Sequence, residues 1–268
     1  MICGRGVTWR FVLLIYELTI RRDLEMKKIN MVLVAAGLAV ASMSAFATDT
    51  TCGGVSFKTL HNAANNALAA ASTGGLGLNM WATVVDNTGK VCFVVNTSTK
   101  GANAGNSQWL GSRVISAQKA NTGNAFSLDG LAISSGALFA AVQPGGSLYG
   151  LQESNPVNAV AAYEGNPSNY GKKNDPLVGN RIGGVNVFGG GLPLYQNGVK
   201  VGGIGVSGDT SCTDHAFVWK MRQLLALEPG SGVTQVEKLT LTSGPFDALG
   251  KHATCIGAPI ADQSGFAP

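Results

Sequence analysis

Glycines inside a strand-like run constrain the fold of this chain more than any other feature. Residues 201–208 read Val-Gly-Gly-Ile-Gly-Val-Ser-Gly, an apolar stretch interrupted by glycine. Glycine weakens a strand, because it loses more chain entropy on folding and offers no side chain to pack. A strand keeps such residues where a helix, a neighbouring subunit or a flat ligand must approach its backbone closely. We therefore expect Gly202, Gly203 and Gly205 to face a close partner.

The same run matches two catalytic motifs in part. Gly203 to Gly208 fits the dinucleotide pattern G-x-G-x-x-G, and Glu228 follows as an acidic residue. However, no second strand–helix unit follows, and Glu228 stands at a helix end rather than on a strand. The run from Gly205 also begins like a nucleophile elbow, but Asp209 occupies the position that requires glycine. The sequence therefore favours a structural role for these glycines.

The first 47 residues have the layout of a secretory leader. Met26-Lys27-Lys28 opens a basic segment, Ile29–Val40 is almost wholly apolar, and residues 44–47 end in an A-x-A pattern. We expect residues 26–47 to be a signal peptide and residues 1–25 to be an extension from a start site assigned too early. The apolar segment is short for a hydrocarbon core of about 30 Å, so a retained membrane anchor is the weaker interpretation. The expected location is periplasmic or secreted.

Removing the leader changes the charge balance. It holds six of the 19 Lys and Arg residues and three of the 15 Asp and Glu residues, which leaves 13 basic and 12 acidic residues. No basic stripe remains to follow a phosphate backbone, so we expect no nucleic-acid partner. The carboxylates are scattered, with no close pair suited to glycoside hydrolysis. No nucleophile, base and orienting group can be assembled either, which disfavours an enzyme.

Four cysteines follow the leader: Cys52, Cys92, Cys212 and Cys255. An even count in an exported chain predicts two disulfides, and four cysteines allow three pairings that the sequence does not separate. Proximity along the chain favours Cys52 with Cys92 and Cys212 with Cys255. The alternatives are a catalytic pair of Cys212 and His215, or zinc ligation by the two, both of which need free thiols that export disfavours.

Periodicity predicts a mixture of helices and strands in one domain. The long segment 153–180 has no sustained period, so it is functional or disordered. Asp86–Gly89 and Gln196–Gly198 are typical hairpin turns, and Ser211-x-x-Asp214 is typical of a helix start. Expected helices span residues 57–71, 109–126, 131–142 and 211–228, and expected strands span 81–85, 91–95, 185–188, 192–195 and 199–206.

One pattern in the sequence is formed by Gly189–Leu194, Gly198–Gly208 and Asp214. It resembles the signature of the GlcG/HbpS-like family, which is often labelled haem-binding or haem-degrading. Val84–Gly89 and Ala117–Ala125 add to a resemblance that covers roughly residues 57–227. It implies an α+β fold, profilin-like or PAS-like, with an antiparallel sheet of about five strands flanked by helices. It also implies a homo-oligomer that binds haem or a related tetrapyrrole. Residues 48–236 then form the domain, and Cys255 pins a polar tail over residues 237–268.

One segment departs from the family pattern. Val94–Ala102 stands where the family's second strand runs into Arg-Met-Asp-Gly-Ala. This departure favours an alternative function, that of a ligandless oligomeric accessory or sensor module.

The haem hypothesis selects a set of candidate residues. Haem iron takes His, Met, Cys thiolate or Tyr as an axial ligand, beside apolar walls. His61 and His215 are the candidate metal ligands, and Arg113 and Lys119 are the candidate partners of the propionates. Gly203 and Gly205 are the candidate backbone contacts of the flat ligand.

Each candidate also has a plainer interpretation. His61 borders the core face of the first helix, His215 stands beside Asp214 where a local hydrogen bond is expected, and His252 lies in the tail. Solvated helix charge is the plainer role of Arg113 and Lys119. Met80 and Met221 are the methionines considered as sulfur ligands of haem iron, and we expect both in the core.

We expect the purified mature protein to begin at Thr48 and to contain no free thiol, because export removes the leader and pairs the cysteines. Intact-mass measurement with alkylation under non-reducing conditions tests both points. Four alkylated thiols, or a chain that retains Met26, would contradict the expectation.

Overall fold

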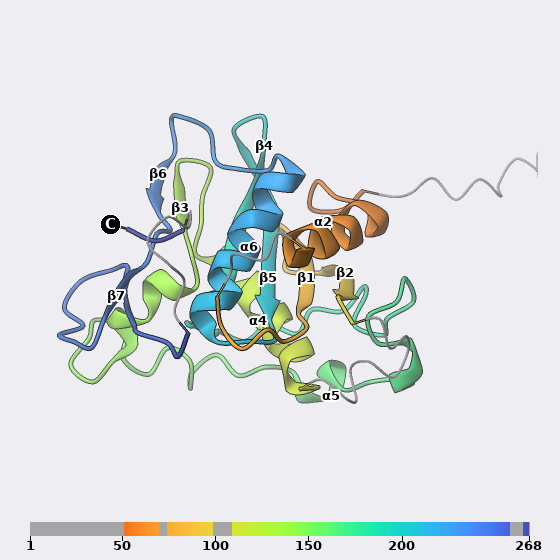
Figure 1. The fold of residues 1–268 in the computed structure, drawn as a ribbon, viewed down its shortest axis with the longest axis horizontal. Coiled ribbons are helices and arrows are strands. Elements are labelled where there is room, and N and C mark those ends of the chain that lie inside the picture. Colours follow the sequence, from red (N-terminus) through yellow and green to blue (C-terminus); the bar gives the residue numbers. More distant parts are fainter. Residues whose placement is uncertain (1–50, 70–73, 99–108, 258–264, 268) are drawn as a thin grey trace, which may run out of the picture. The chain divides into compact units, whose positions relative to one another are not determined.

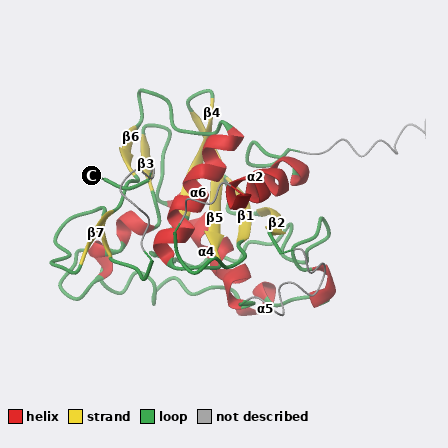
Figure 2. Ribbon diagram, viewed as in Figure 1, coloured by secondary structure: helices red, strands yellow, loops and turns green. Residues whose placement is uncertain are grey.

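The computed structural model describes residues 51–69, 74–98, 109–257 and 265–267. Helices cover both faces of a four-stranded sheet, as Figures 1 and 2 show. The expected α+β class is confirmed, with four strands in the sheet where the sequence suggested about five. In this part of the chain, no helix is both long enough and apolar enough to cross a bilayer. The predicted signal peptide lies outside the described residues.

The sheet has the strand order β2-β1-β5-β4, and all neighbours are antiparallel. Its strands are β1 (Trp81–Asp86), β2 (Val91–Asn96), β4 (Gly191–Gln196) and β5 (Val199–Ser207). Both predicted hairpins are confirmed. The Asp86 carboxylate accepts hydrogen bonds from the Thr88 and Lys90 amides, which fixes the first turn.

Two helices pack on one face of the sheet. These are α2 (Phe57–Ala69) and α6 (Ser211–Leu225), which also contact each other. Because side chains alternate along a strand, Ile204 and Val206 of β5 face this layer together with Val84 of β1. The expected first helix ends at Ala69, and residues 70 and 71 lie outside the described part.

Helix α4 (Gly111–Ala125) packs on the opposite face, against β1, β4 and β5. Here the glycines of β5 meet their close partner. A Cβ atom at Gly203 would lie 2.3 Å from the Ala120 carbonyl oxygen, and one at Gly205 would lie 2.0 Å from the Ser116 carbonyl oxygen. The strand keeps glycine at both positions because the helix backbone occupies the space of a side chain.

The long segment 153–180 is folded and contributes to the core. It contains the short helix α5 (Ala159–Ala162) and a 3₁₀ turn, η5 (Pro167–Asn169). Its Asp175 forms a buried ion pair with Arg113 of α4, and the Arg113 guanidinium lies over the Tyr170 ring at 3.6 Å. The segment is therefore neither disordered nor free to act as a lid.

Two predicted elements are wrong. The stretch 131–142 is not a helix but the strand β3 (Leu131–Ile133) followed by the 3₁₀ turns η3 (Gly136–Leu138) and η4 (Ala140–Val142). Serine side chains cause the break: Ser134 donates to the Glu237 carbonyl, and Ser135 donates to the Phe188 carbonyl. Residues 185–188 are not a strand, and Val187 packs against the turns instead.

Helix α6 begins at Ser211, and its N-cap is Thr210, one residue before the predicted capping residue Ser211. The Thr210 side chain accepts a hydrogen bond from the Thr213 amide. The helix ends at a left-handed residue, Ala226, before Pro229 is reached.

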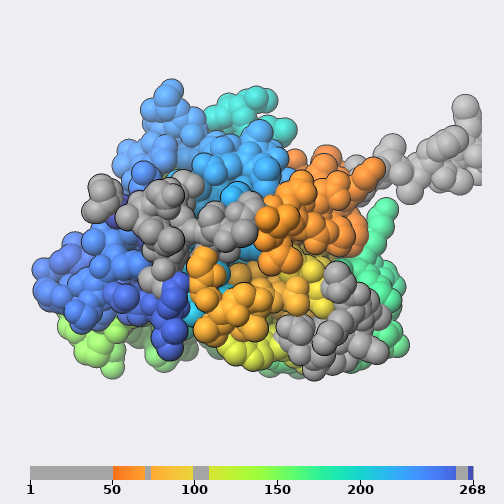
Figure 3. Space-filling view, viewed as in Figure 1, coloured from red at the N-terminus to blue at the C-terminus, as the bar shows by residue number. Residues whose placement is uncertain are grey.

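The tail after α6 lies against the domain (Figure 3). It contains β6 (Thr234–Val236), which pairs with β3, and the pair β7 (Thr240–Thr242) and β8 (Lys251–Ala253). Glu237 forms a buried ion pair with Arg222 of α6. Both predicted disulfides, Cys52–Cys92 and Cys212–Cys255, are confirmed, and the second fastens the tail to α6.

We expect Gly205→Ala to lower the free energy of unfolding by about 1–3 kcal/mol, because the added methyl group overpacks the contact with α4. Gly111→Ala, at the start of the helix α4 that Gly205 contacts, is the control. A Cβ atom at Gly111 meets nothing within 4 Å, so this change leaves stability unchanged or raises it by up to about 1 kcal/mol. Urea unfolding measures both. Equal losses in the two variants would contradict the close-contact interpretation.

Candidate functional site

A cleft opens between the start of α4, the end of β5 and the first turn of α6. Its volume is about 300 Å³, at the lower end of the range for small-molecule sites. Its walls are Trp109, Ser112, Ile115, Lys119, Phe188, Ser207, Asp209, Ser211 and Asp214. Trp109 is 61% exposed and Phe188 is 45% exposed, which is high for large aromatic side chains. The cleft therefore offers two aromatic walls to an incoming molecule.

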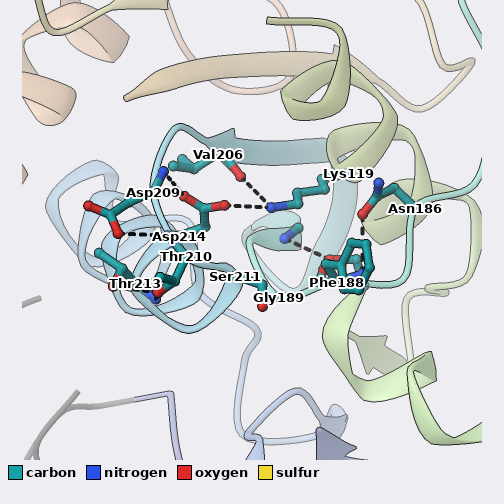
Figure 4. Close-up of polar contacts among 12 residues, drawn as sticks. Lys119, Asn186, Phe188, Gly189, Val206, Asp209, Thr210, Ser211, Thr213 and Asp214 are labelled. Atoms are coloured by element: carbon teal, nitrogen blue, oxygen red, sulfur yellow. Dashed lines mark hydrogen bonds and ion pairs between the residues drawn. The ribbon is translucent and has the colours of Figure 1, made fainter. Parts of the chain in front are cut away.

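A buried ion pair lies at the inner end of this cleft. Lys119 Nζ is 2.7 Å from Asp214 Oδ2 and also donates to the Val206 carbonyl oxygen, as Figure 4 shows. Asp214 Oδ1 accepts a hydrogen bond from the Asp209 amide. Burial raises the pKa of Asp214 to about 6, because desolvation outweighs the attraction of Lys119. This carboxyl group therefore titrates close to neutral pH.

Asp209 organises the turn that forms one wall. Its carboxylate accepts hydrogen bonds from the Leu76 amide at 2.9 Å, from the Leu78 amide at 3.0 Å and from the Thr210 amide. The residue that breaks the nucleophile-elbow pattern therefore ties residues 76–78 to the start of α6. Sequence analysis missed this role, since nothing along the chain links segments so far apart.

Of the two candidate iron ligands, His215 is fully buried. Its Nε2 lies 3.0 Å from the Gly265 carbonyl oxygen, and its ring lies between Trp219 and Phe266. Burial lowers its pKa to about 3, so the ring is neutral. The expected local hydrogen bond beside Asp214 is therefore replaced by one to the tail, and His215 does not line the cleft.

His61 is the one histidine of the three with a partly exposed ring, because His252 is also buried. Its Nδ1 lies 3.2 Å from Asn65 Nδ2, and its ring stacks on Phe57. It lies on α2 and is not among the residues that line the cleft. Its role as an iron ligand stays a prediction.

Arg113 does not face the cleft, and its neighbours occupy its donors. Its Nε donates to Asp175 at 3.0 Å and its Nη1 donates to the Ala162 carbonyl oxygen at 2.9 Å. The side chain is fully buried, so propionates do not reach it. The expectation of a solvated helix charge is wrong for Arg113 and for Lys119, which is 2% exposed.

The expected backbone contact of a ligand with Gly203 and Gly205 also needs correction. Helix α4 fills the space above both glycines, so this face of β5 has no room for a ligand. Met80 and Met221 are core residues, as expected. The sequence did not single out the aromatic walls, because the exposure of Trp109 and Phe188 depends on tertiary packing.

Two other cavities have weaker chemistry. One of about 550 Å³ lies between η4 and residues 246–249, and Asp247 is its single ionisable wall residue. One of about 280 Å³ lies between α2 and α6 and has no ionisable wall residue. Neither combines aromatic walls with a buried charged pair.

Comparisons with known proteins point to one family. The family model described as "Haem degrading protein HbpS-like" matches residues 55–222. Protein ORFY of Klebsiella pneumoniae is 22% identical, with a TM-score of 0.43 over 65% of this chain and 92% of that chain. A PduOC:haem complex is 20% identical, with a TM-score of 0.43 over 65% and 94%. A double mutant of HbpS from Streptomyces reticuli is 17% identical, with a TM-score of 0.40 over 68% and 92%. No curated protein sequence matches.

We expect the Asp214 carboxyl group to titrate near pH 6 in the folded protein, above its ordinary pKa of 3.8. A raised folded-state pKa means that protonation favours folding. This contribution is full below about pH 4 and is lost as the pH rises through 6. Carbon-13 NMR of the aspartate carboxyl groups measures the midpoint, and Asp214→Asn identifies the signal by its loss. A midpoint near 4 would contradict the assignment.

Proposed function

Because the chain belongs to the HbpS-like family of haem-degrading proteins, we propose that it is an exported protein that binds haem or a related tetrapyrrole. The observation that carries this proposal is the cleft with the exposed aromatic side chains of Trp109 and Phe188. A planar ring system gains most from contact with flat aromatic walls, because apolar area and ring stacking add together. The cleft is the place in the described structure where such walls stand open.

The charge of the cleft bears on how a tetrapyrrole would lie. Lys119 is its single cation, and it already binds Asp214. A carboxylate inserted there would have to compete with Asp214 for the ammonium group. We propose that an apolar edge of the ring enters the cleft, while the propionates stay in solvent. The small volume, about 300 Å³, supports insertion of an edge rather than enclosure.

The residues of the cleft do not fit an axially ligated haem. They include no His, Met, Cys or Tyr, the side chains that usually hold haem iron. We therefore propose that the protein recognises the flat ring system of the tetrapyrrole. This recognition does not require iron. His61 is the accessible imidazole that could ligate iron from outside the cleft walls.

The proposal also includes export and self-association, which rest on different observations. Two disulfides support export, since disulfides persist in oxidising compartments. Gly203 and Gly205 offer no flat face to a second copy, because α4 covers them within the chain. Self-association therefore stays a prediction that rests on the family resemblance.

The alternative function, a ligandless accessory or sensor module, has one observation in its favour. The cleft walls in the described part of the chain include none of the side chains that usually ligate haem iron. Ligand binding separates the two functions directly.

We expect saturable binding of both haemin and metal-free protoporphyrin. Trp109→Ala or Phe188→Ala should weaken both by about fivefold, since loss of one stacking wall costs on the order of 1 kcal/mol. Absorbance and tryptophan-quenching titrations measure the affinities. His61→Ala tests ligation separately, because a change confined to haemin would assign the iron to His61.

Tyr149→Ala is the matched control, an exposed aromatic residue that does not line the cleft. Equal affinity in wild type and in both wall variants would remove the cleft as the site. No saturable binding of either compound would favour the ligandless alternative.

A further inference from the structure

Two short motifs face each other where the tail meets α6. Cys212 and His215 form a C-x-x-H motif in the first turns of α6, and His252 and Cys255 form an H-x-x-C motif at β8. The Cys212–Cys255 disulfide joins the two. One ligand atom each of Cys212, His252 and Cys255 lies within 4.8 Å of the others. We propose that reduction of this disulfide creates a site for Zn²⁺ or a similar thiophilic divalent cation, held by Cys212, Cys255 and His252.

The distances suit such an ion. In a tetrahedral zinc site, bonds of about 2.0–2.3 Å place neighbouring ligand atoms about 3.3–3.8 Å apart. The two sulfurs are 2.01 Å apart in the disulfide, and the histidine nitrogen lies within 4.8 Å of both. Once the sulfur–sulfur bond is broken, the sulfurs need to separate by about 1.5 Å to reach this range. Cys212 and His252 are buried, while Cys255 is partly exposed and gives the ion a route of entry.

The start of α6 stabilises the sulfur that a metal would need. The Cys212 amide lies 3.2 Å from Cys255 Sγ, and Ser211 Oγ lies 3.4 Å from the same sulfur. The amide groups at a helix N-terminus favour a negative charge. The Cys212 amide and the Ser211 hydroxyl are therefore placed to donate to Cys255 Sγ when this sulfur binds a metal.

The imidazole of His252 is held in a suitable orientation. Its Nδ1 lies 2.8 Å from the Ala253 carbonyl oxygen, so Nδ1 carries the proton and Nε2 has the free lone pair. A carbonyl partner of this kind commonly orients metal-binding histidines. The Gly189 amide now donates to Nε2 at 3.3 Å, a long hydrogen bond that the metal would replace.

His215 lies outside this group of three ligand atoms and is the candidate for the fourth position. It stands three residues after Cys212 on the same helix, and its Nδ1 is a buried atom with no hydrogen-bond partner in the described structure. A Cys₂His₂ set would form if this nitrogen turned to the ion. Otherwise water takes the fourth position.

Reduction of the Cys212–Cys255 disulfide takes up two electrons and two protons. A dithiol reductant transfers two electrons to the disulfide and is itself oxidised to a disulfide, and the sulfurs of Cys212 and Cys255 take up two protons. Zn²⁺ then displaces these two protons, and the two thiolates cancel its charge. The oxidised protein holds no metal at this place, and the reduced protein does.

The other disulfide offers an internal control. Among the described residues, the cluster at Cys212 is the single group of three or more His, Cys, Asp or Glu side chains with metal-ligand spacing. Cys52 and Cys92 belong to no such group. Reduction should therefore create a metal site at one disulfide and not at the other.

Cobalt titration of the purified protein tests the proposal. After reduction with a phosphine under anaerobic conditions, we expect one equivalent of Co²⁺ to give a thiolate-to-cobalt charge-transfer band and tetrahedral visible bands. Zn²⁺ should displace the cobalt, and the oxidised protein should give neither band. Zn²⁺ should also raise the Tm of the reduced protein, because metal binds the folded state.

Variants locate the ligands. Reduced Cys52→Ser/Cys92→Ser should keep the full cobalt spectrum, whereas Cys255→Ser and His252→Ala should bind at least about tenfold more weakly. His215→Ala reports on the fourth position by a change in the visible bands. Absence of the charge-transfer band in the reduced wild type would overturn the proposal, as would cobalt binding with wild-type affinity in both Cys255→Ser and His252→Ala. A reduced protein that unfolds and does not refold with Zn²⁺, monitored by circular dichroism, would also overturn it.

Discussion

The contact between α4 and the glycines of β5 sets the position of the candidate site. Because Gly203 and Gly205 lack side chains, the carbonyl groups of Ser116 and Ala120 lie directly on the strand. Lys119, on the same stretch of helix, then reaches past the end of β5 to Asp214 on the other side of the sheet. Side chains at these glycines would lift the helix and separate the ammonium group from the carboxylate. The glycines thus allow the close packing of α4 on β5, and this packing positions the residues that line the cleft.

Three buried ion pairs in the described part of the chain fasten the remaining segments to this core. Arg113 holds the long segment 153–180, Lys119 joins α4 to α6, and Arg222 holds the tail. Burying a charge pair gains little net stability, but removing one partner costs about 3–5 kcal/mol. Such pairs therefore specify where a segment docks more than they add to stability. This explains why a segment with no periodicity is nevertheless folded.

The sequence predicted what local patterns encode. The hairpins, the sheet-covering helices and both disulfides followed from periodicity, turn residues and spacing. The helix predicted over residues 131–142 was wrong because Ser134 and Ser135 donate hydrogen bonds to carbonyl groups far along the chain. Hydrophobic periodicity contains no signal for such contacts. The site candidates depended on exposure. Arg113 and His215 looked available along the sequence, and only the docking of residues 162–175 and of Gly265 buries them. Trp109 and Phe188 had no sequence signal, since their exposure is decided by how α4 and α6 pack.

The tail decides which chemistry this member of the family presents. The family match ends at residue 222, and beyond it the chain supplies Glu237, His252, Cys255 and Gly265. These residues cover the side of α6 that carries Cys212 and His215. The tail therefore removes one histidine from solvent and in the same place brings a second histidine to a disulfide. The aromatic cleft lies on the Asp214 side of the same helix and stays open. Helix α6 thus lies between two environments, the open cleft with aromatic walls on its Asp214 side and the Cys212–Cys255 disulfide under the tail on its other side.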